Sequence, residues 1–483
     1  MLIDGEDAGE SFDLLKIPAL GRLLKWRHAR TAFQIPVLLL SLIMIAHGLL
    51  GSRLAPENLA TNLTWIHFRG VLVLILLLAG NFFCMACPFV LVRDWARKLH
   101  QPRWNWPRKL RTKWLSVILF ATILFSYEAF NLWASPWWTA WLIVGYFVAI
   151  LAIDLTFKHA TFCKFVCPIG QFNFVASTLS PLQVKVRKQA VCDSCATKDC
   201  IRGRRPDPKA LVTFQRGCEL ALFQPLKVGN LDCTFCLDCV QACPHDNVGI
   251  QTRMPGEELL EDPRRSGIGR LSRRHDIGAL ATIFVFGALI NALGMVSPLY
   301  EVERWLSRLL HLQNRPAILS IVFVLVLVIE PLLLLAAATG LSKTWGGLQQ
   351  RWLFVMTRYS YGLVPMGFGM WLAHYGFHLL TGLYTAIPVA QNTVKSIIGY
   401  PLFGEPLWTL VGLPPHIVQP IEYGFLVLGL GGSLVLLQQL AESDAPRRWI
   451  RLFAPWAALS LILFATSWWL LSQPMDMRAT FLE

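Results

Sequence analysis

Nine long apolar segments constrain the fold of this 483-residue chain more than any other feature. A helix of about 20 apolar residues is needed to cross a bilayer. The sequence therefore predicts a polytopic α-helical membrane protein with about nine transmembrane helices. The predicted spans are residues 32–51, 67–83, 114–133, 137–157, 276–298, 316–340, 358–383, 416–440 and 449–472. Hydrophobic residues make up 54% of the chain and charged residues 15%, which excludes a disordered or simple soluble protein.

Lysine and arginine are concentrated in alternate loops. With the N-terminus placed in the cytoplasm, seven of the 44 basic residues fall on the opposite side, namely Arg53, Arg69, Arg304, Arg308, Arg315, Lys395 and Arg478. Cytoplasmic loops carry such an excess. We therefore expect the bacterial inner (cytoplasmic) membrane, with the N-terminus inside and the C-terminus outside. This topology accounts for the net charge of +14, so nucleic-acid binding is not indicated.

The twelve cysteines all fall between Cys84 and Cys243, on the predicted cytoplasmic side. The cytoplasm keeps thiols reduced, so metal or redox chemistry is favoured over structural disulfides. Residues 181–262 form the only long polar stretch and predict one soluble domain. The expected organisation is a four-helix membrane module at 1–180, this domain at 181–262, and a five-helix membrane module at 263–483.

The polar stretch contains the cysteine run of bacterial ferredoxins. Cys233, Cys236, Cys239 and Cys243, followed by Pro244, reproduce C-x2-C-x2-C-x3-C-P. Three cysteines at two-residue intervals let a tight loop surround one cubane, while the fourth ligates a second cluster. Zinc sites use cysteine pairs separated by a longer loop. The run predicts an inserted α+β ferredoxin domain of the bacterial two-cluster type.

Four further cysteines precede this run and complete a two-cluster set. The crossed ligation of such domains assigns one [4Fe-4S] cluster to Cys192, Cys195, Cys200 and Cys243. It assigns the other to Cys233, Cys236, Cys239 and Cys218. The first half departs from the usual pattern, because four residues precede Cys200 where two are usual and residues 201–217 read as an insertion. An exchange of ligands between the two clusters therefore stays open.

Two cysteine pairs lie at the inner membrane boundary, and each ends in Cys-Pro. The first is Cys84-x2-Cys87-Pro88, and the second is Cys163-x3-Cys167-Pro168. Their equivalent places in two helical hairpins suggest a loose repeat, which would bring the four thiols together. They could hold a third metal or iron-sulfur centre or act as redox thiols. The alternative is that they are small buried thiols that only pack at helix ends.

These pairs, the following sequence CPIGQFNF and the ferredoxin run resemble the membrane-bound polyferredoxins, the family that includes NapH, NosR and CcoG. The resemblance covers about residues 30–260. It implies a protein that passes electrons between a quinone pool or cytoplasmic donor and a partner redox enzyme, or that reduces a metal ion for assembly. The chain departs from the family in the x2 spacing of its first pair, in the 201–217 insertion and in its added C-terminal module.

The C-terminal module has no cysteine, so any chemistry there must use other groups. His374 and His378 lie at i and i+4 on one helix face and could ligate haem or copper or serve a quinone; packing is the alternative. His47 and His67 are expected at the same outer depth, where they could simply be solvated. Glu330 precedes Pro331 in a predicted span, which suits either a proton path or a kinked helix.

Together these patterns favour a membrane-bound iron-sulfur electron-transfer protein, a component of an oxidoreductase. We expect two [4Fe-4S] clusters, with a third centre, quinone or haem as further candidates. Two other hypotheses stay open: a metal-reducing assembly factor for a respiratory metalloenzyme, and a quinone-docking subunit of a larger respiratory complex. Arg202, Arg204 and Arg205 either anchor the domain at the membrane or dock an acidic electron-transfer partner.

Overall fold

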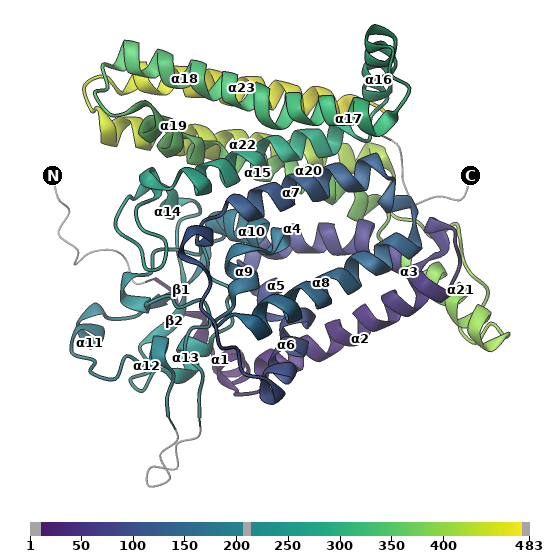
Figure 1. Ribbon diagram of the computed structural model, residues 1–483, viewed down its shortest axis with the longest axis horizontal. Coiled ribbons are helices and arrows are strands. Elements are labelled where there is room, and N and C mark those ends of the chain that lie inside the picture. Colours follow the sequence, from purple (N-terminus) through teal and green to yellow (C-terminus); the bar gives the residue numbers. More distant parts are fainter. Residues whose placement is uncertain (1–10, 206–213, 476–483) are drawn as a thin grey trace.

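The computed structural model describes residues 11–205 and 214–475, which are mostly helical and include one small sheet. The long helices run in roughly the same direction, and the cysteine-rich polar segment lies at one end of them (Figure 1). The short helices α16 (Ser297–Leu310) and α21 (Ala386–Ile398) lie at the other end. The membrane helices and the polar segment are therefore segregated along the long axis of the molecule.

Within the described ranges, seven helices are long and apolar enough to cross a membrane. They are α2 (Ala29–Leu50), the continuous stretch Leu59–Ala79, α8 (Pro136–Thr156), α15 (His275–Leu293), the stretch Arg315–Gly346, α22 (Pro415–Asp444) and α23 (Trp449–Ser472). Two of these spans contain a π-helical segment. The stretch Leu59–Ala79 consists of α3 (Leu59–Asn62), the π-helical η3 (Leu63–Phe68) and α4 (Arg69–Ala79). The stretch Arg315–Gly346 consists of α17 (Arg315–Val324), the π-helical η9 (Leu325–Ile329) and α18 (Glu330–Gly346).

Helices also occupy the other two predicted spans. Helix α7 (Trp114–Ala129) is apolar but has 16 residues. Helix α20 (Val364–Thr381) is buried almost throughout by its neighbours, and its histidines and glycines lower its mean hydropathy. A buried helix does not need an apolar surface facing lipid, which accounts for α20. The nine-span arrangement, with α7 and α20 as the two further spans, stays a prediction.

Close helix packing explains the glycine-rich stretch of α22. Gly429 lies against Gly369 of α20, and a Cβ atom at Gly429 would come within 2.8 Å of the backbone oxygen of Pro365. Gly431, on another side of the same helix, has no atom within 4 Å of such a Cβ position. The glycines therefore serve the contact between α20 and α22, at the centre of the C-terminal module.

The polar segment is built around a two-stranded antiparallel sheet, β1 (Leu182–Val186) with β2 (Val248–Thr252). In their register Leu182 pairs with Thr252 and Val186 pairs with Val248. Short helices connect the strands: α11 (Gln189–Asp193), α12 (Asp199–Arg202) and α13 (Asp238–Ala242), with α14 (Glu257–Leu260) following β2. The pairing of β1 with β2 brings together the two ends of the segment that contains the eight ferredoxin cysteines.

The N-terminal segment also joins the sheet. Asp13 forms an isolated bridge with Gln251, and its carboxylate pairs with Arg187 at 2.7 Å. Helix α1 (Pro18–Lys25) then leads to α2, and Lys25 pairs with Asp246 at 2.8 Å. Residues that precede the first span thus fasten the polar segment to the membrane module.

The remaining helices are short or connect spans. They are η1 (Leu14–Lys16), η2 (Ala55–Glu57), α5 (Phe82–Met85), α6 (Pro88–Leu99), η4 (Arg108–Leu110), η5 (Leu132–Ala134), α9 (Thr161–Phe165), α10 (Pro168–Ala176), η6 (Ser177–Leu179), η7 (Gln224–Leu226), η8 (Leu271–Arg273), α19 (Trp352–Ser360) and η10 (Tyr361–Leu363).

Candidate iron-sulfur sites

The two Cys-Pro pairs form matching corners at the ends of spans. In each, a short helix (α5 or α9) carries the first cysteine, and the second cysteine is the N-cap residue of the next helix (α6 or α10). Proline follows at the first helical position, where its missing N–H costs nothing. This repeated geometry shows that the two corners are built alike and explains why both pairs end in Cys-Pro.

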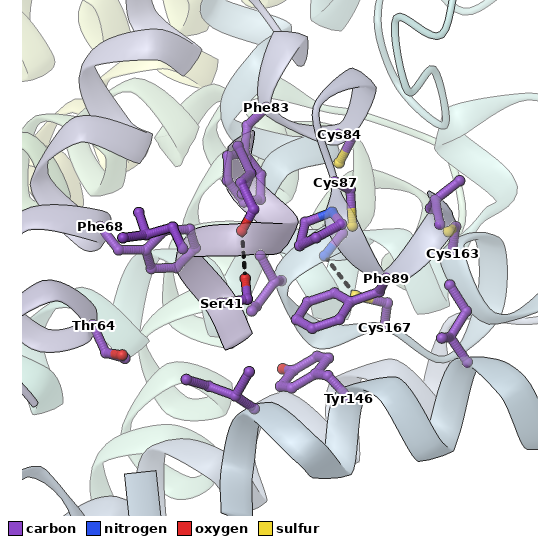
Figure 2. A pocket seen from close by; sticks show the side chains of 18 of the residues that line it. Ser41, Thr64, Phe68, Phe83, Cys84, Cys87, Phe89, Tyr146, Cys163 and Cys167 are labelled. Carbon is purple, nitrogen blue, oxygen red and sulfur yellow. Dashed lines mark hydrogen bonds between the residues drawn. The ribbon is translucent and has the colours of Figure 1, made fainter. Parts of the chain in front are cut away.

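The structure brings Cys84, Cys87, Cys163 and Cys167 to the wall of one cavity of about 340 Å³ (Figure 2). The side chains from the two corners lie on neighbouring parts of that wall, and the remaining lining is mainly apolar. We call these four residues the boundary group. Their convergence was predicted from the repeat, although the cavity itself was not.

Hydrogen-bond donors and burial characterise the boundary group. The side-chain amide of Asn173 donates to Cys84 Sγ at 3.3 Å, and the backbone N–H of Gly170 donates to Cys167 Sγ at 3.2 Å. Burial raises the pKa of all four thiols, that of Cys167 to about 12. N–H donors to the sulfurs of Cys84 and Cys167 suit negatively charged iron ligands. The group therefore fits an iron-sulfur cluster.

The predicted set Cys192, Cys195, Cys200 and Cys243 also lines one cavity, of about 20 Å³. Asn247 donates twice to this group, from its side chain to Cys192 Sγ at 3.2 Å and from its backbone to Cys243 Sγ at 3.3 Å. We call these residues the outer group, because all four are partly exposed. The convergence of these four cysteines around one cavity matches the first predicted ligand set.

The second predicted set lies deeper. Cys233, Cys236 and Cys239 are buried, and Cys218 Sγ accepts a hydrogen bond from the backbone of Leu222 at 3.4 Å. Burial raises the pKa of Cys218 to about 11, and the neighbouring Cys233 raises it further. Burial also raises the pKa of Cys239, and the neighbouring Cys218 and Cys233 raise it further. We call these four cysteines the inner group; their proximity fits the predicted ligand set.

Among the described residues, no three His, Cys, Asp or Glu side chains converge as they would around a single metal ion. The four cysteines of a cubane bind four different irons, so they stand further apart than the ligands of one ion. The cysteine groups are therefore compatible with clusters.

The inner group lies directly beside the boundary group. Asn81, three residues before Cys84, donates its side-chain amide to the backbone oxygen of Cys233 at 2.9 Å. Thr234 lines the boundary cavity. Gly80 has a φ of +66° and would place a Cβ atom 2.8 Å from the Phe235 ring, so the chain passes close to the ring here. Cys243 continues from α13 to the outer group, which makes the inner group the middle one of three.

Buried ion pairs, which the sequence did not predict, join the same parts. Glu219, next to Cys218, accepts from Arg30 at 2.8 Å and from Arg93 at 2.7 Å. Arg93 is fully buried and also pairs with Asp154 at 3.2 Å, while Arg30 reaches Asp238 at 3.3 Å. Burial would raise the pKa of Glu219, but the two arginines hold it well below its ordinary value. The one sequence feature that pointed to this network was Glu219, an acidic residue next to Cys218 in a mostly basic stretch.

The histidines predicted for the outer half make separate contacts. His374 and His378 are buried on α20 with ring centroids 5.0 Å apart. His47 accepts from the backbone of Leu59 at 3.0 Å. His67 lies 3.3 Å from the backbone oxygen of Leu383 and lines the boundary cavity. Of these residues, His67 is the one that the structure connects to a cysteine group.

Glu330 begins α18, directly after the π-helical turn η9, and its side chain is exposed on the surface of the helix bundle. The hydrophobic side chains around it, such as Ile329 and Leu333, are exposed as well. The predicted irregularity at Glu330-Pro331 is therefore present as a π-helical turn. The exposed position does not place Glu330 beside any cysteine group.

A family model described as a 4Fe-4S binding domain matches residues 61–107 and 138–180. These two segments contain the whole boundary group and end before Cys192, so this match concerns the membrane corners rather than the ferredoxin run. The chain is similar to the membrane-bound polyferredoxins. The resemblance expected from the paired Cys-Pro corners is thereby confirmed.

Three curated relatives share parts of the chain. The putative electron transport protein YccM of Escherichia coli is 26% identical over 232 residues, covering 42% of this chain and 58% of YccM. The ferredoxin-type protein NapH of Escherichia coli is 27% identical over 198 residues, covering 38% of this chain and 66% of NapH. The regulatory protein NosR of Stutzerimonas stutzeri is 24% identical over 197 residues, covering 36% of this chain and 25% of NosR. The chain thus spans less than two thirds of each relative, and no solved structure matches it.

Proposed function

We propose that this protein is a membrane-bound iron-sulfur electron-transfer protein that relays electrons between a quinone pool or cytoplasmic donor and a partner redox enzyme. The observation that carries the proposal is the boundary group: four cysteines of two matched segments line one cavity next to the inner group. Names of two relatives, an electron transport protein and a ferredoxin-type protein, support the same class. The protein would then be a component of an oxidoreductase.

Three cysteine groups would hold the cofactors. The boundary group would hold one [4Fe-4S] cluster within the membrane module, and the inner and outer groups would hold two more in the ferredoxin domain at 181–262. A bound cluster takes up and releases one electron at a time without moving atoms. Domain boundaries at 180 and 262, the ferredoxin fold and a cytoplasmic position of this domain are parts of the proposal.

The chain itself contributes burial, hydrogen bonds and fixed spacing. Asn173, Gly170 and Asn247 donate to cysteine sulfurs, which stabilises negative charge there. Lys113 holds the loop of the inner group by pairing with Asp232 at 2.5 Å. The pair Lys113–Asp232, together with the Asn81–Cys233 hydrogen bond, helps to fix the polar segment on the membrane helices, which would keep the three groups in one order from the membrane to the surface.

A quinone is a candidate redox partner in the membrane, and the lining of the boundary cavity favours it. The cavity extends from the cysteines past Tyr146 to Thr64 and His67. A neighbouring cavity of about 130 Å³ shares Thr64 and Tyr146 with it and reaches Arg69 and Tyr375. An apolar cavity with a few polar groups suits a lipid-soluble redox carrier beside the boundary group.

The assembly-factor hypothesis makes a different prediction in cells. If the protein relays electrons, its deletion should leave a partner enzyme complete in metal but unable to turn over. If it reduces a metal ion for insertion, deletion should leave the partner without that metal. Metal analysis of the partner enzyme from the deletion strain separates the two, and co-purification in mild detergent tests membership in a respiratory complex.

Spectroscopy of the full chain tests the proposed function. Protein purified without oxygen should contain iron and acid-labile sulfide, and reduction should produce the EPR signals of [4Fe-4S] clusters. Addition of a quinol or of oxidised quinone should change the redox state of those signals. Absence of iron and sulfide after anaerobic reconstitution would refute the proposal.

A further inference from the structure

The outer group lies beneath a rim of exposed basic residues. We propose that this rim is the docking surface for a soluble, acidic one-electron carrier protein that carries a flavin or an iron-sulfur cluster. The proposal rests on the proposed function and names the partner that would exchange electrons with the outer group. We define the rim as Lys188, Lys198, Arg202 and Arg205, in and around α11 and α12, all of which are exposed.

Exposure separates the outer group from the inner group. Cys233, Cys236 and Cys239 are 8%, 7% and 5% exposed, whereas the outer group is partly exposed throughout. The boundary group is also partly exposed, but its cysteines line a mainly apolar cavity among the membrane helices. Lys198 lines the cavity of the outer group directly. Electron transfer between two proteins requires close approach of their centres, so a soluble carrier is best served by the outer group.

The charge of residues 185–205 is strongly one-sided. Residues 185–205 contain seven lysines and arginines against two aspartates. One of those aspartates, Asp199, lies 3.9 Å from Arg204, which leaves Asp193 as the exposed acid of this stretch. A positive surface attracts and orients an acidic protein and raises its association rate.

Position argues against a role of the rim as a membrane anchor. Basic anchors lie close to the ends of spans, as Arg108 and Lys109 do a few residues before α7. Helices α11 and α12 instead lie at the outer edge of the polar segment, away from the membrane helices (Figure 1). The rim is therefore placed to meet a protein from solution rather than the lipid surface.

The transfer between the carrier and the outer group involves one electron only. One electron would leave the reduced carrier, which would thereby be oxidised by one electron, and the cluster held by the four outer cysteines would be reduced by one electron. No bond is formed or broken, and no proton or leaving group takes part. The reverse transfer uses the same contact, so the docking surface does not depend on the direction of electron flow.

The test compares charge-reversal variants of the full-length, iron-loaded protein in detergent. Lys188→Glu combined with Arg202→Glu reverses the rim, and Arg108→Glu combined with Lys109→Glu is the control near the membrane. Stopped-flow reduction by reduced flavodoxin, an acidic flavoprotein, should slow about tenfold or more in the rim variant. The control variant should match the wild type, and added salt should slow the wild type towards the rim variant.

Reduced methyl viologen serves as a small reductant that needs no docking surface. It should reduce the wild type and both variants at equal rates. An unchanged rate with flavodoxin in the rim variant would overturn the docking proposal, as would a loss confined to binding of vesicles that contain anionic lipid. Failure of methyl viologen to reduce the wild type would instead refute the proposed function itself.

Discussion

At the scale of single residues, the donors around the boundary cysteines distinguish them from ordinary buried thiols. The Asn173 amide points its N–H at Cys84 Sγ, and the Gly170 N–H meets Cys167 Sγ. A thiol that only packs does not need such donors, whereas negative charge on cluster sulfurs does. The sequence showed the asparagine within CPIGQFNF but could not show which sulfur it would meet.

Replacement of Asn173 should shift a reduction potential. In Asn173→Leu the Cys84 sulfur loses a donor that stabilises the more negative, reduced state, so we expect a lower reduction potential for the boundary centre. EPR-monitored redox titration measures the shift. Gln34→Leu is the matched control, because Gln34 donates to the backbone oxygen of Cys87 at 3.2 Å and not to a sulfur. Equal potentials in the wild type and Asn173→Leu would contradict this role.

Removal of Arg93 should strongly destabilise the protein. Arg93→Met leaves the buried Asp154 carboxylate without a cation and leaves Glu219 paired with Arg30 alone. Removal of one partner of a buried ion pair typically costs about 3–5 kcal/mol. Arg216→Gln is the control, because Arg216 pairs with Asp94 at 2.8 Å but is half exposed, and such pairs contribute about 1 kcal/mol or less. Thermal unfolding in detergent should show a large loss for Arg93→Met and a small one for Arg216→Gln. Similar losses would refute the importance of the buried network.

At the scale of elements, the Cys-Pro corners and the contact between α20 and α22 decide where helices meet. Both depend on small local features: a proline at the first helical position in the corners, and Gly369 against Gly429 in the C-terminal module. The corners were predictable because their pattern repeats in the sequence. The glycines of α22 indicated a close helix contact. The sequence could not show that α20 is the partner, since periodicity does not say which helices touch.

Two glycines of α22 should respond differently to the same substitution. Gly429→Val would push a side chain into the backbone of α20 and should lower the unfolding temperature, because overpacking typically costs about 1–3 kcal/mol. Gly431→Val adds the same side chain where a Cβ atom has open space and should leave it nearly unchanged. Thermal unfolding and yield in detergent measure the difference. Equal effects of both substitutions would mean that α20 and α22 do not meet at Gly429.

The elements that the sequence placed less well share one cause. The span expected at 67–83 begins earlier, at Leu59, and contains the π-helical segment η3. Polar residues such as Asn62 and Thr64 lowered the apolar signal there, although they lie inside the packed structure. The N-terminal residues around Asp13 gave no strand pattern and become ordered through β2. Tertiary contacts decide both cases, and local sequence does not report them.

At the scale of the whole molecule, three cysteine groups follow one another from the membrane module to the exposed rim. The grouping of the cysteines was predictable, because cysteine spacing is set by the short loops that surround a cluster. The order of the groups was not, because it depends on contacts between distant segments, such as Asn81 with Cys233 and Arg30 with Glu219. Depth was a weaker guide for the outer-half histidines, since His67 lines the boundary cavity whereas His374 and His378 lie together on α20.

The central claim is that the boundary group holds a cluster of its own. The direct measurement is the iron content and the EPR spectrum of the double variant Cys84→Ser/Cys167→Ser, compared with the wild type. The account predicts about four fewer irons per chain and the loss of one EPR signal, while the signals of the inner and outer groups persist. Cys195→Ser, in the outer group, should instead change a different signal. An unchanged iron content and spectrum in the double variant would contradict the account.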